Sequence, residues 1–285
     1  MLRIDNLEKY YGETLAVDKL SLSVNPGEIF GLLGPNGAGK TTTVQMAVGF
    51  LKPDRGTIHI GGAGSPESAT VRRRIGIAPQ SLSLYADLTA DENLEFFAAL
   101  YNLTREMGRE KLAQRITDVL DSVGLTNRRN DRVKTFSGGM KRRLNIAVAV
   151  LHQPDLLILD EPTAGVDPQS RNAILETTER LRDQGKTIIY TTHYMEEAQR
   201  VCNRVAIIDH GKILEIDTVD GLIDNHGGIS TLSIELADRT LAIETDEPLA
   251  ELNRVANSET IVRFHVERPT LEEVFLNLTG KSLRD

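Results

Sequence analysis

The sequence contains little of what disulfide-stabilised, membrane-spanning or nucleic-acid-binding proteins need. Cys202 is its one cysteine, so no internal disulfide can form and the chain fits a reducing compartment. Its most apolar runs, such as Leu144–Leu151, are far shorter than the roughly 20 residues that cross a bilayer. Acidic residues outnumber basic ones by 41 to 33, and the resulting net charge of −8 argues against binding to nucleic acid.

The start of the chain also has little of a targeting segment. Arg3, Asp5 and Glu8 come early, with no uninterrupted apolar region behind them, so we expect no signal peptide. We therefore expect the chain to stay in the cytoplasm unless another protein holds it at a membrane. Its 285 residues are 40% hydrophobic and 26% charged, which is typical of a globular protein with one large domain or one plus a small appendage.

Short aliphatic runs alternate with helical patterns up to about Asp217, which predicts an α/β fold with a mainly parallel sheet. The strands expected in that sheet are Glu28–Leu33, Ile75–Ala78, Leu156–Asp160, Thr187–Thr191 and Val205–Asp209. Two alternating segments at the start, Leu2–Tyr10 and Leu15–Val24, predict an antiparallel β portion that flanks this core.

The pattern changes after Asp217. Thr231–Leu236 and Thr260–Val266 alternate like strands of a half-buried sheet. We therefore expect one domain over residues 1–217 and a small α+β accessory domain over residues 218–285.

The end of the chain carries the signals of a short amphipathic helix. Thr270 and Glu273 have the spacing of a capping box, and Gly280 is a typical stop. Between them four apolar residues recur at helical spacing: Leu271, Val274, Phe275 and Leu278.

The first strong chemical signal is the segment Gly34-Pro35-Asn36-Gly37-Ala38-Gly39-Lys40-Thr41, which fits the pattern G-x-x-x-x-G-K-[ST] between an apolar strand and a helical pattern. Glycines let the backbone wrap an anion, and the helix N-terminus adds positive potential. We expect Lys40 to reach the β- and γ-phosphates of a nucleotide and the Thr41 hydroxyl to bind Mg²⁺. The candidate phosphate-binding residues are Gly34, Asn36, Gly37, Ala38, Gly39, Lys40, Thr41 and Thr42.

The second signal is a pair of carboxylates at the end of an apolar strand. Leu156–Leu159 predicts a buried strand, and Asp160 and Glu161 follow at its carboxyl end, where open α/β sheets bind ligands. We expect Asp160 to hold Mg²⁺, directly or through water. Glu161 is placed to polarise an attacking water.

With Phe136-Ser137-Gly138-Gly139-Met140, which lies between these two signals, the sequence resembles the ATP-binding-cassette (ABC) family of transporter ATPases. The resemblance rests on seven motifs in family order over roughly Leu2–Asp217. Tyr11 resembles the aromatic residue that stacks on adenine, and it precedes the phosphate loop Gly34–Thr41. Gln80 then resembles the glutamine that senses Mg²⁺ and the attacking water.

The remaining four motifs complete this order. Ser137-Gly138-Gly139 matches the family signature, and Asp160 and Glu161 match the carboxylates at the strand end. Ala164-Gly165-Val166-Asp167 resembles the loop that crosses the dimer interface, and His193 resembles the histidine that reads the γ-phosphate. The resemblance thus gives Glu161, His193, Gln80 and Lys40 as catalytic candidates and Thr41, Gln80 and Asp160 as Mg²⁺ ligands.

The resemblance implies a phosphate-loop (P-loop) NTPase core with a helical signature subdomain. Ser137 can cap a helix, and Gly138 and Gly139 expose backbone N–H groups at its positive end. The chain would then carry two anion sites, although one phosphate group needs only one of them. In the family the signature site closes on ATP held by a second subunit, so a head-to-tail dimer is implied, with hydrolysis coupled to closure.

The departures from the family pattern point to a subgroup. Phe136 and Met140 replace the commoner leucine and glutamine, and Ala164-Gly165-Val166-Asp167 replaces Ser-Ala-Leu-Asp. The first two variants and the ending Pro269–Gly280 resemble ATPase subunits of drug-resistance, ion and polysaccharide exporters. The resemblance therefore implies a subunit that hydrolyses ATP with Mg²⁺ and powers export. It would pair with a second ATPase subunit, as a homodimer in the ATP-bound state, and would act on a polytopic membrane permease at the cytoplasmic face of the cell membrane.

Residues from Gln80 to Asn93 lie where the family meets its membrane partner. Four apolar residues of this segment either form that contact or belong to the core: Leu82, Leu84, Tyr85 and Leu88.

Several of these residues have plainer interpretations in isolation. Tyr11 could be a partly buried surface tyrosine, Gln80 the start of a loop and His193 a structural histidine, but the family order favours the functional roles. For the basic residues Lys141–Arg143 we expect a solvated helix turn rather than contacts with phosphate. Two rival functions stay open: a soluble cassette ATPase that acts on ribosomes or nucleic acid, and a regulatory clamp that binds ATP without useful turnover.

Overall fold

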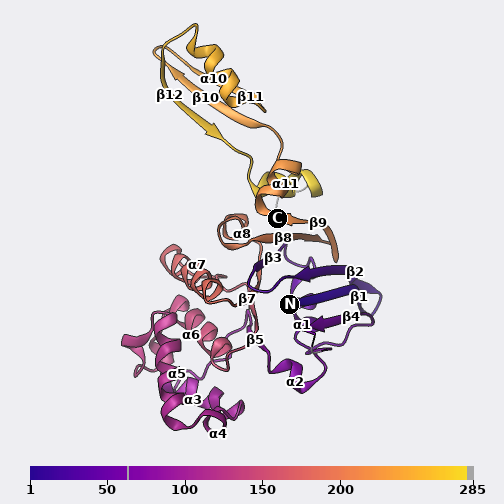
Figure 1. Ribbon diagram of the computed structural model, residues 1–285, viewed down its shortest axis with the longest axis vertical. Coiled ribbons are helices and arrows are strands. Elements are labelled where there is room, and N and C mark those ends of the chain that lie inside the picture. The colour runs from indigo at the N-terminus through magenta and orange to yellow at the C-terminus, as the bar shows by residue number, and fades with distance from the viewer. Residues whose placement is uncertain (63, 281–285) are drawn as a thin grey trace. The chain divides into compact units, whose positions relative to one another are not determined.

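The computed structural model describes residues 1–62 and 64–280. The chain divides into two compact units, Met1–Ile216 and Asp217–Asp285 (Figure 1). Within the described residues, no helix combines the length and the apolar character that a membrane span requires.

The first unit is built on a six-stranded sheet in the order β5-β6-β7-β3-β8-β9. Its strands are β3 (Ile29–Leu33), β5 (Ile75–Ala78), β6 (Leu156–Asp160), β7 (Thr187–Thr192), β8 (Arg204–Asp209) and β9 (Lys212–Thr218). The first five pair in parallel, which confirms the predicted parallel sheet. Strands β3, β6 and β7 are buried at every residue, because both faces of a parallel sheet are covered. The edge strand β9 was not predicted.

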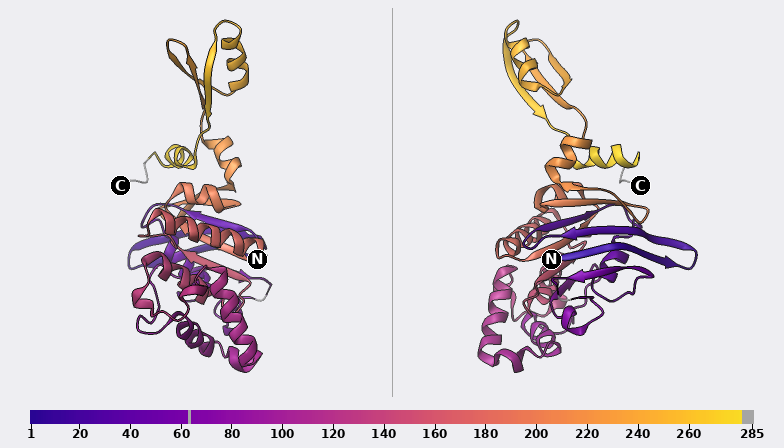
Figure 2. Two further views of the ribbon diagram at one scale, coloured as in Figure 1. Left: turned by 90° about the vertical axis from the view of Figure 1, so that its left-hand side faces the viewer. Right: turned by 45° about the vertical axis from the view of Figure 1, so that its right-hand side comes forward.

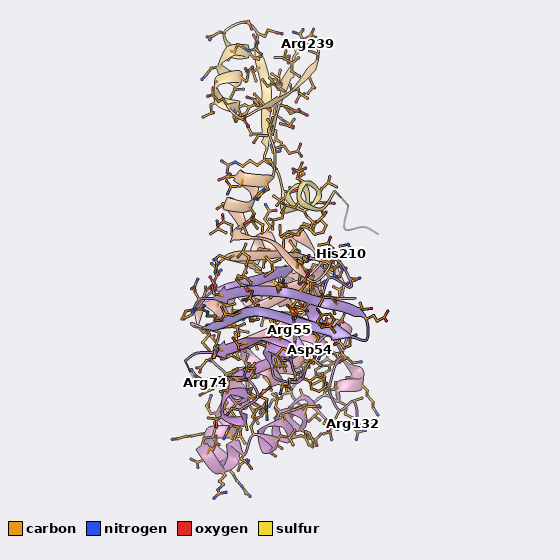
Figure 3. The ribbon with its side chains drawn as sticks, turned by 90° about the vertical axis from the view of Figure 1, so that its right-hand side faces the viewer. Asp54, Arg55, Arg74, Arg132, His210 and Arg239 are labelled. Atoms are coloured by element: carbon orange, nitrogen blue, oxygen red, sulfur yellow. The ribbon has the colours of Figure 1, made fainter. Side chains whose placement is uncertain are left out.

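A second sheet contains three antiparallel strands in the order β2-β1-β4. Strands β1 (Leu2–Tyr11) and β2 (Thr14–Val24) confirm the predicted antiparallel portion, and β4 (Arg55–Ile60) is an addition that the sequence did not reveal. The start of β4 is tied to β1 by charged pairs, since Asp54 and Arg55 (Figure 3) lie 3.0 Å from Lys9 and 3.5 Å from Glu8.

A large hydrophobic core lies between the two sheets and around α1 (Lys40–Ala47). It joins residues of β1, β4, α1, β3, β6, β7 and β8, among them Ile4, Ile60, Met46, Phe30, Ile158, Ile189 and Ile208. Each fully buried aliphatic side chain of this kind contributes about 1.5–3 kcal/mol to stability. The core thereby holds the phosphate loop, which joins β3 to α1, against both sheets.

Helices make up the rest of the first unit. Three of them, α3 (Ala90–Leu100), α4 (Leu103–Met107) and α5 (Arg109–Ser122), gather on the side away from β1 and β2, as Figures 1 and 2 show. Helix α6 (Gly138–Val150) packs against α3, α5, α7 and strands β5 and β6, so it joins this helical portion to the sheet. The remaining helices are α2 (Ala69–Arg72), α7 (Pro168–Asp183) and α8 (Met195–Val201), with 3₁₀ turns at Thr126–Arg128 and Val133–Thr135.

The second unit contains a three-stranded antiparallel sheet in the order β11-β10-β12. Strands β10 (Ser230–Leu236) and β12 (Ile261–Glu267) were predicted, whereas β11 (Thr240–Thr245) was not. Helix α10 (Pro248–Ala256) covers one face of the sheet (Figure 2) and completes a small core with Leu232, Ile234, Leu236 and Val255. At the turn between β10 and β11, Arg239 (Figure 3) forms an ion pair in which its Nη2 donates to both carboxylate oxygens of Glu259 at 2.7 Å.

Two further helices, α9 (Val219–His226) and α11 (Leu271–Thr279), contact each other in the second unit. The predicted capping residues behave as expected, because the Glu273 carboxylate accepts a 2.6 Å hydrogen bond from the Thr270 backbone N–H. Gly280 ends α11 in a left-handed conformation with φ of 68°.

Candidate nucleotide site

The candidate site lies where the parallel strands end. The segments that follow β3, β5, β6 and β7 all leave the same edge of the sheet, since these strands are parallel. Together they enclose a cavity of about 590 Å³. Its lining residues are Ala16, Asn36, Gly37, Gly39, Lys40, Thr41, Thr42, Gln80, Glu161, Ala164, Gly165, His193 and Tyr194.

Glycines give the phosphate loop its shape. Gly39 precedes α1 with φ of 102°, a left-handed conformation that side chains disfavour, and a Cβ there would lie 2.7 Å from the carbonyl oxygen of Ala16. A Cβ on Gly34 would come within 2.2 Å of the Ile208 carbonyl. No side chain caps the N-terminus of α1, so its first N–H groups stay available for an anion at the cavity.

Lys40 places a buried cation beside this loop. Its Nζ donates to the carbonyl oxygens of Gly34 at 2.7 Å and Pro35 at 3.0 Å, and lies 3.5 Å from Glu161 Oε1. Burial lowers the pKa of Lys40, while the carboxylates of Glu161 and Asp160 act in the opposite direction. The two carboxylates thus balance the positive charge of the ammonium group only in part, so it can still attract a phosphate.

Glu161 is the point at which the motifs meet. Gln80 Nε2 donates to its Oε2 at 2.8 Å, and His193 Nδ1 lies 3.3 Å from its Oε1, on the oxygen that also faces Lys40. Its backbone has φ of 46°, a left-handed conformation that costs a non-glycine residue about 1–3 kcal/mol. Its N–H donates to the Thr191 hydroxyl at 2.9 Å, which helps to hold this conformation.

The three predicted Mg²⁺ ligands offer the oxygen atoms that this ion prefers. Thr41 and Gln80 line the cavity, and the amide nitrogen of Gln80 is engaged with Glu161, which leaves its oxygen to act as a ligand. Asp160 lies behind the lining and is only 4% exposed, with Oδ1 accepting a 2.7 Å hydrogen bond from Thr191. Burial raises the pKa of Asp160. The donor set of hydroxyl, amide oxygen and carboxylate therefore fits Mg²⁺ at this edge of the cavity.

Several predicted site residues lie outside the cavity lining. Tyr11 ends β1 and is half-exposed, and Gly34 and Ala38 support the phosphate loop from behind. The signature residues Ser137 and Gly138 are exposed at the start of α6, where the Ser137 hydroxyl accepts from the Met140 N–H at 3.2 Å. The structure thus brings together Lys40, Thr41, Gln80, Glu161 and His193, but not Tyr11 or the signature.

The loop after β6 links the signature to the cavity wall. Ala164 and Gly165 line the cavity, and Asp167 caps α7 by accepting from the Ser170 N–H at 2.9 Å. The hydrogen bonds from Ser170 hold the pKa of Asp167 below its usual range. Gly139 packs directly on Ser170, since a Cβ on this glycine would lie 2.2 Å from the serine Oγ.

Comparison with known proteins agrees with this geometry. A family model described as ABC transporter matches residues 17–164, more than half of the chain. The chain belongs to the ABC transporter family of ATPases.

Two curated relatives match the whole length of this ABC ATPase. A linearmycin resistance ATP-binding protein of Bacillus subtilis is 43% identical, with 100% of both chains covered. The Nod factor export ATP-binding protein I of Cupriavidus metallidurans is 39% identical, with 100% of this chain and 99% of that protein covered.

A solved structure extends the comparison to the fold. A dimeric post-hydrolysis state of an ATP-binding cassette, bound to ADP and Pi, has a TM-score of 0.69 and 26% identity, and the match covers 76% of this chain and 98% of that one. The protein is thus an ATP-binding subunit of an ABC transporter and an ATPase. Subunits of this family work with membrane permease partners and form dimers.

Sequence reasoning missed a layer of polar residues behind the cavity of this ABC ATPase. Thr191 was recognised only as a strand residue, yet its hydroxyl joins Asp160 to the Glu161 N–H. The buried carboxylate of Glu197 accepts from Thr163, Tyr190 and Thr192 at 2.8–3.1 Å. The sequence did hold a signal for this layer, namely the hydroxyl side chains in the otherwise apolar strand Ile188–Thr192. Hydroxyls that are buried need hydrogen-bond partners, so they indicate polar neighbours.

The expectation of a solvated basic turn at Lys141–Arg143 is wrong for two of its three residues. Arg142 donates to the carbonyl oxygens of Gln80 and Ala164, and Arg143 donates to those of Val123 and Gly124. Both side chains are half-buried, and burial lowers their pKa values. Each guanidinium group thus donates to two backbone carbonyl oxygens of neighbouring loops, as its planar fork of N–H groups allows.

Proposed function

We propose that this ABC ATPase powers export through a separate polytopic membrane permease, with residues 1–217 as the ATPase domain and residues 218–285 as an accessory domain. The phosphate loop with Lys40 and Thr42 binds the β- and γ-phosphates of ATP. Tyr11, which lies outside the cavity lining, would stack on the adenine. The names of the relatives, which refer to linearmycin resistance and Nod factor export, support the assignment to export.

The observation that carries this proposal is the set of partners around Glu161. One carboxylate faces Lys40, Gln80 and His193 at 3.5, 2.8 and 3.3 Å, and it is 7% exposed inside a cavity that a triphosphate can enter. A carboxylate in this position can accept a proton from water, and Gln80 orients both the carboxylate and the water. His193, on the far side, contacts the γ-phosphate.

Thr41, Gln80 and Asp160 would hold Mg²⁺, which supplies positive charge that neutralises the phosphates. Asp160 receives the Thr191 hydroxyl on one oxygen, so its other oxygen remains for the ion or for a water bound to it. Lys40 adds a fixed charge next to them, so the phosphate end of ATP meets positive groups on two sides.

We further propose that the signature completes the site of a second subunit. Ser137 and Gly138 are exposed at the start of α6 and lie outside the cavity of their own chain. The N–H groups at the start of a helix attract a phosphate, and Gly138 has no side chain that would shield them. In a head-to-tail dimer they would face ATP held by the partner subunit.

An apolar patch near the cavity is our candidate for the permease contact. Leu82 and Tyr85 follow Gln80 and are 39% and 47% exposed, whereas Leu84 and Leu88 are half-buried. Tyr85 packs on Phe96 with a ring separation of 4.5 Å, and Leu100 lies one turn further along α3. This contact would hold the subunit at the cytoplasmic face of the membrane.

The decisive test is Glu161→Gln in the full-length chain. We expect its steady-state ATPase rate to fall by about 10²–10⁴-fold, because the group that accepts the proton is lost. Gel filtration with ATP and Mg²⁺ should then show a dimer that persists. The control is Glu196→Gln, which removes the same charge from an exposed position on α8. Normal turnover of Glu161→Gln would contradict the assignment.

The same variant tests the biological role. Tagged Glu161→Gln protein with ATP and Mg²⁺ is used as bait in detergent-solubilised membranes of the source organism, and mass spectrometry identifies what is captured. A polytopic membrane protein in near-stoichiometric amount is the expected result. Capture of ribosomal proteins or nucleic acid without a membrane subunit would contradict the export role while leaving the ATPase assignment intact.

A further inference from the structure

One face of α6 is fastened to the backbone of the loop that carries Gln80. Asn145 and Arg142 lie three residues apart and therefore share this face. The Asn145 Nδ2 donates to the carbonyl oxygen of Pro79 at 3.1 Å, and the Arg142 Nη1 donates to that of Gln80. Two consecutive carbonyls of one loop are thus bound by one helix.

Arg142 also reaches the loop that follows β6. Its Nη2 donates to the carbonyl oxygen of Ala164 at 3.3 Å. Gln80 and Ala164 both line the cavity, so one guanidinium group bridges two walls of the candidate nucleotide site. The planar fork of arginine suits such a bridge, whereas a lysine ammonium group on a flexible stem holds two separate carbonyls in a fixed geometry less well.

Burial makes these contacts specific. Asn145 is 4% exposed, and the Arg142 side chain is half-buried between the two loops. Polar groups that leave water require hydrogen-bond partners, so any movement of α6 that broke these contacts would leave donors and carbonyls unsatisfied. The helix and the Gln80 loop are therefore expected to move together.

The same loop determines the contact with Glu161. The backbone of Gln80 is held by Arg142, and its side chain donates to Glu161 Oε2 at 2.8 Å. The other end of this connection is the signature, because α6 begins at Gly138, four residues before Arg142. The path from the signature to the carboxylate thus runs through one helix, two side chains and one loop.

We propose that Arg142 and Asn145 are positioning residues that fasten Gln80 to α6, so that the placement of the signature end of α6 sets the contact between Gln80 and Glu161. This inference rests on the proposed roles of Gln80 and Glu161 in ATP hydrolysis. It makes the hydrolytic geometry of one site depend on the position of the helix that presents the signature to the partner subunit's site.

The neighbouring residue provides a matched control. Arg143 lies on the same turn of α6 and also donates to two carbonyl oxygens, those of Val123 at 2.9 Å and Gly124 at 3.2 Å. Those carbonyls follow α5 and do not line the cavity. Arg143→Gln therefore removes the same charge and the same kind of hydrogen bond without releasing the Gln80 loop.

The experiment measures kcat and KM for ATP with the full-length chain carrying Arg142→Gln, Arg142→Lys, Asn145→Ala or Arg143→Gln. We expect Arg142→Gln to lower kcat about tenfold with KM within about twofold, because ATP still binds but the geometry of hydrolysis is loosened. Asn145→Ala should show a smaller loss of kcat, Arg142→Lys a partial recovery, and Arg143→Gln a kcat within about twofold of the unmodified chain. Thermal unfolding checks that each variant is folded at the assay temperature.

A double-mutant cycle with Gln80→Ala separates positioning from general stability. If Arg142 acts through Gln80, Arg142→Gln should cost much less in the Gln80→Ala background than alone, since the side chain that it positions is already gone. Equal losses of kcat in both backgrounds, or equal losses for Arg142→Gln and Arg143→Gln, would overturn the inference. If Arg142→Gln does not fold, the same double-mutant cycle is measured with Arg142→Lys and Asn145→Ala.

The outcome distinguishes the two levels of the proposal. Turnover that survives Glu161→Gln or is unchanged by Gln80→Ala counts against the proposed function itself. When both of those variants lose turnover but Arg142→Gln and Asn145→Ala behave like Arg143→Gln, the link between α6 and Gln80 alone is wrong.

Discussion

The two signature glycines, Gly138 and Gly139, have opposite packing, so the same substitution should have opposite effects on stability. A Cβ on Gly139 would lie 2.2 Å from Oγ and 2.3 Å from Cβ of Ser170, whereas a Cβ on Gly138 would meet no atom within 4 Å. Alanine at position 139 therefore requires α6 and α7 to move apart, and alanine at position 138 requires no movement.

The expected magnitude follows from how firmly Ser170 is held. Its hydroxyl donates to Asp167 at 2.7 Å and its N–H to the same carboxylate at 2.9 Å, and rotation of the hydroxyl would still leave its Cβ in the way. Overpacking of this kind costs about 1–3 kcal/mol. For a domain of about 200 residues this lowers Tm by roughly 2–12 °C. Gly138→Ala should instead gain about 0.4–1 kcal/mol, through the lower entropy of the unfolded chain.

Urea unfolding of the two variants without nucleotide, followed by circular dichroism, measures these effects. The double variant Gly139→Ala with Ser170→Gly adds a direct check, because the two closest atoms are then gone and the Ser170 Cα lies 3.4 Å from the new methyl group. The double variant should be more stable than Gly139→Ala alone, and its free energy of unfolding should exceed the value that the sum of the two single effects predicts. Gly139→Ala protein as stable as Gly138→Ala protein would refute the packing argument.

Two predictions concern the carboxylate behind the cavity. Burial raises the pKa of Asp160 above its value in the unfolded chain, so its contribution to stability is present below about pH 3.8 and is lost as the pH rises through the folded-state pKa. Asp160→Asn should therefore unfold at higher urea concentration than the unmodified chain at pH 7 but not at acidic pH, while its ATPase activity falls. Thr191→Val should cost about 1–3 kcal/mol, because Asp160 loses its hydroxyl donor and the Glu161 N–H is left with the Thr191 carbonyl oxygen at 3.2 Å, and Thr191→Ser should restore most of this in the same urea assay.

Strands covered on both faces could be predicted from the sequence, whereas three edge strands, β4, β9 and β11, could not. Leu156–Asp160 is a continuous aliphatic run because each of its side chains is buried, and such runs stand out from the helices around them. In contrast, β11 (Thr240–Thr245) has no fully buried residue, and β4 contains Gly56 with φ of 86°. A strand with a weakly apolar face, or one that contains a glycine, has a sequence pattern like that of a loop when its partner strand is unknown.

The residues of the candidate site likewise fall into those that the sequence identified and those that it did not. Lys40 and Glu161 could be located because each stands in a short local pattern, whereas Gln80 and His193 were located through the order of the family motifs; the cavity brings all four together. Arg142 could not, because its partners are 62 and 22 residues away and a basic residue on a helix is usually solvated. Local motifs thus identify the groups that face a ligand, while the groups that position them depend on contacts between distant elements.

The environment of Glu161 shows why those positioning groups matter. Its charge is buried and its backbone is left-handed, and each feature by itself would destabilise the fold. The Thr191 hydroxyl and carbonyl oxygens hold the strained peptide, Lys40 balances the charge and Gln80 donates a hydrogen bond to the carboxylate, so these contacts together support the conformation. Gln80 is in turn fastened by Arg142. A small displacement of α6 therefore acts on the least stable part of the site, and this is where a change at the signature can have its largest effect on hydrolysis.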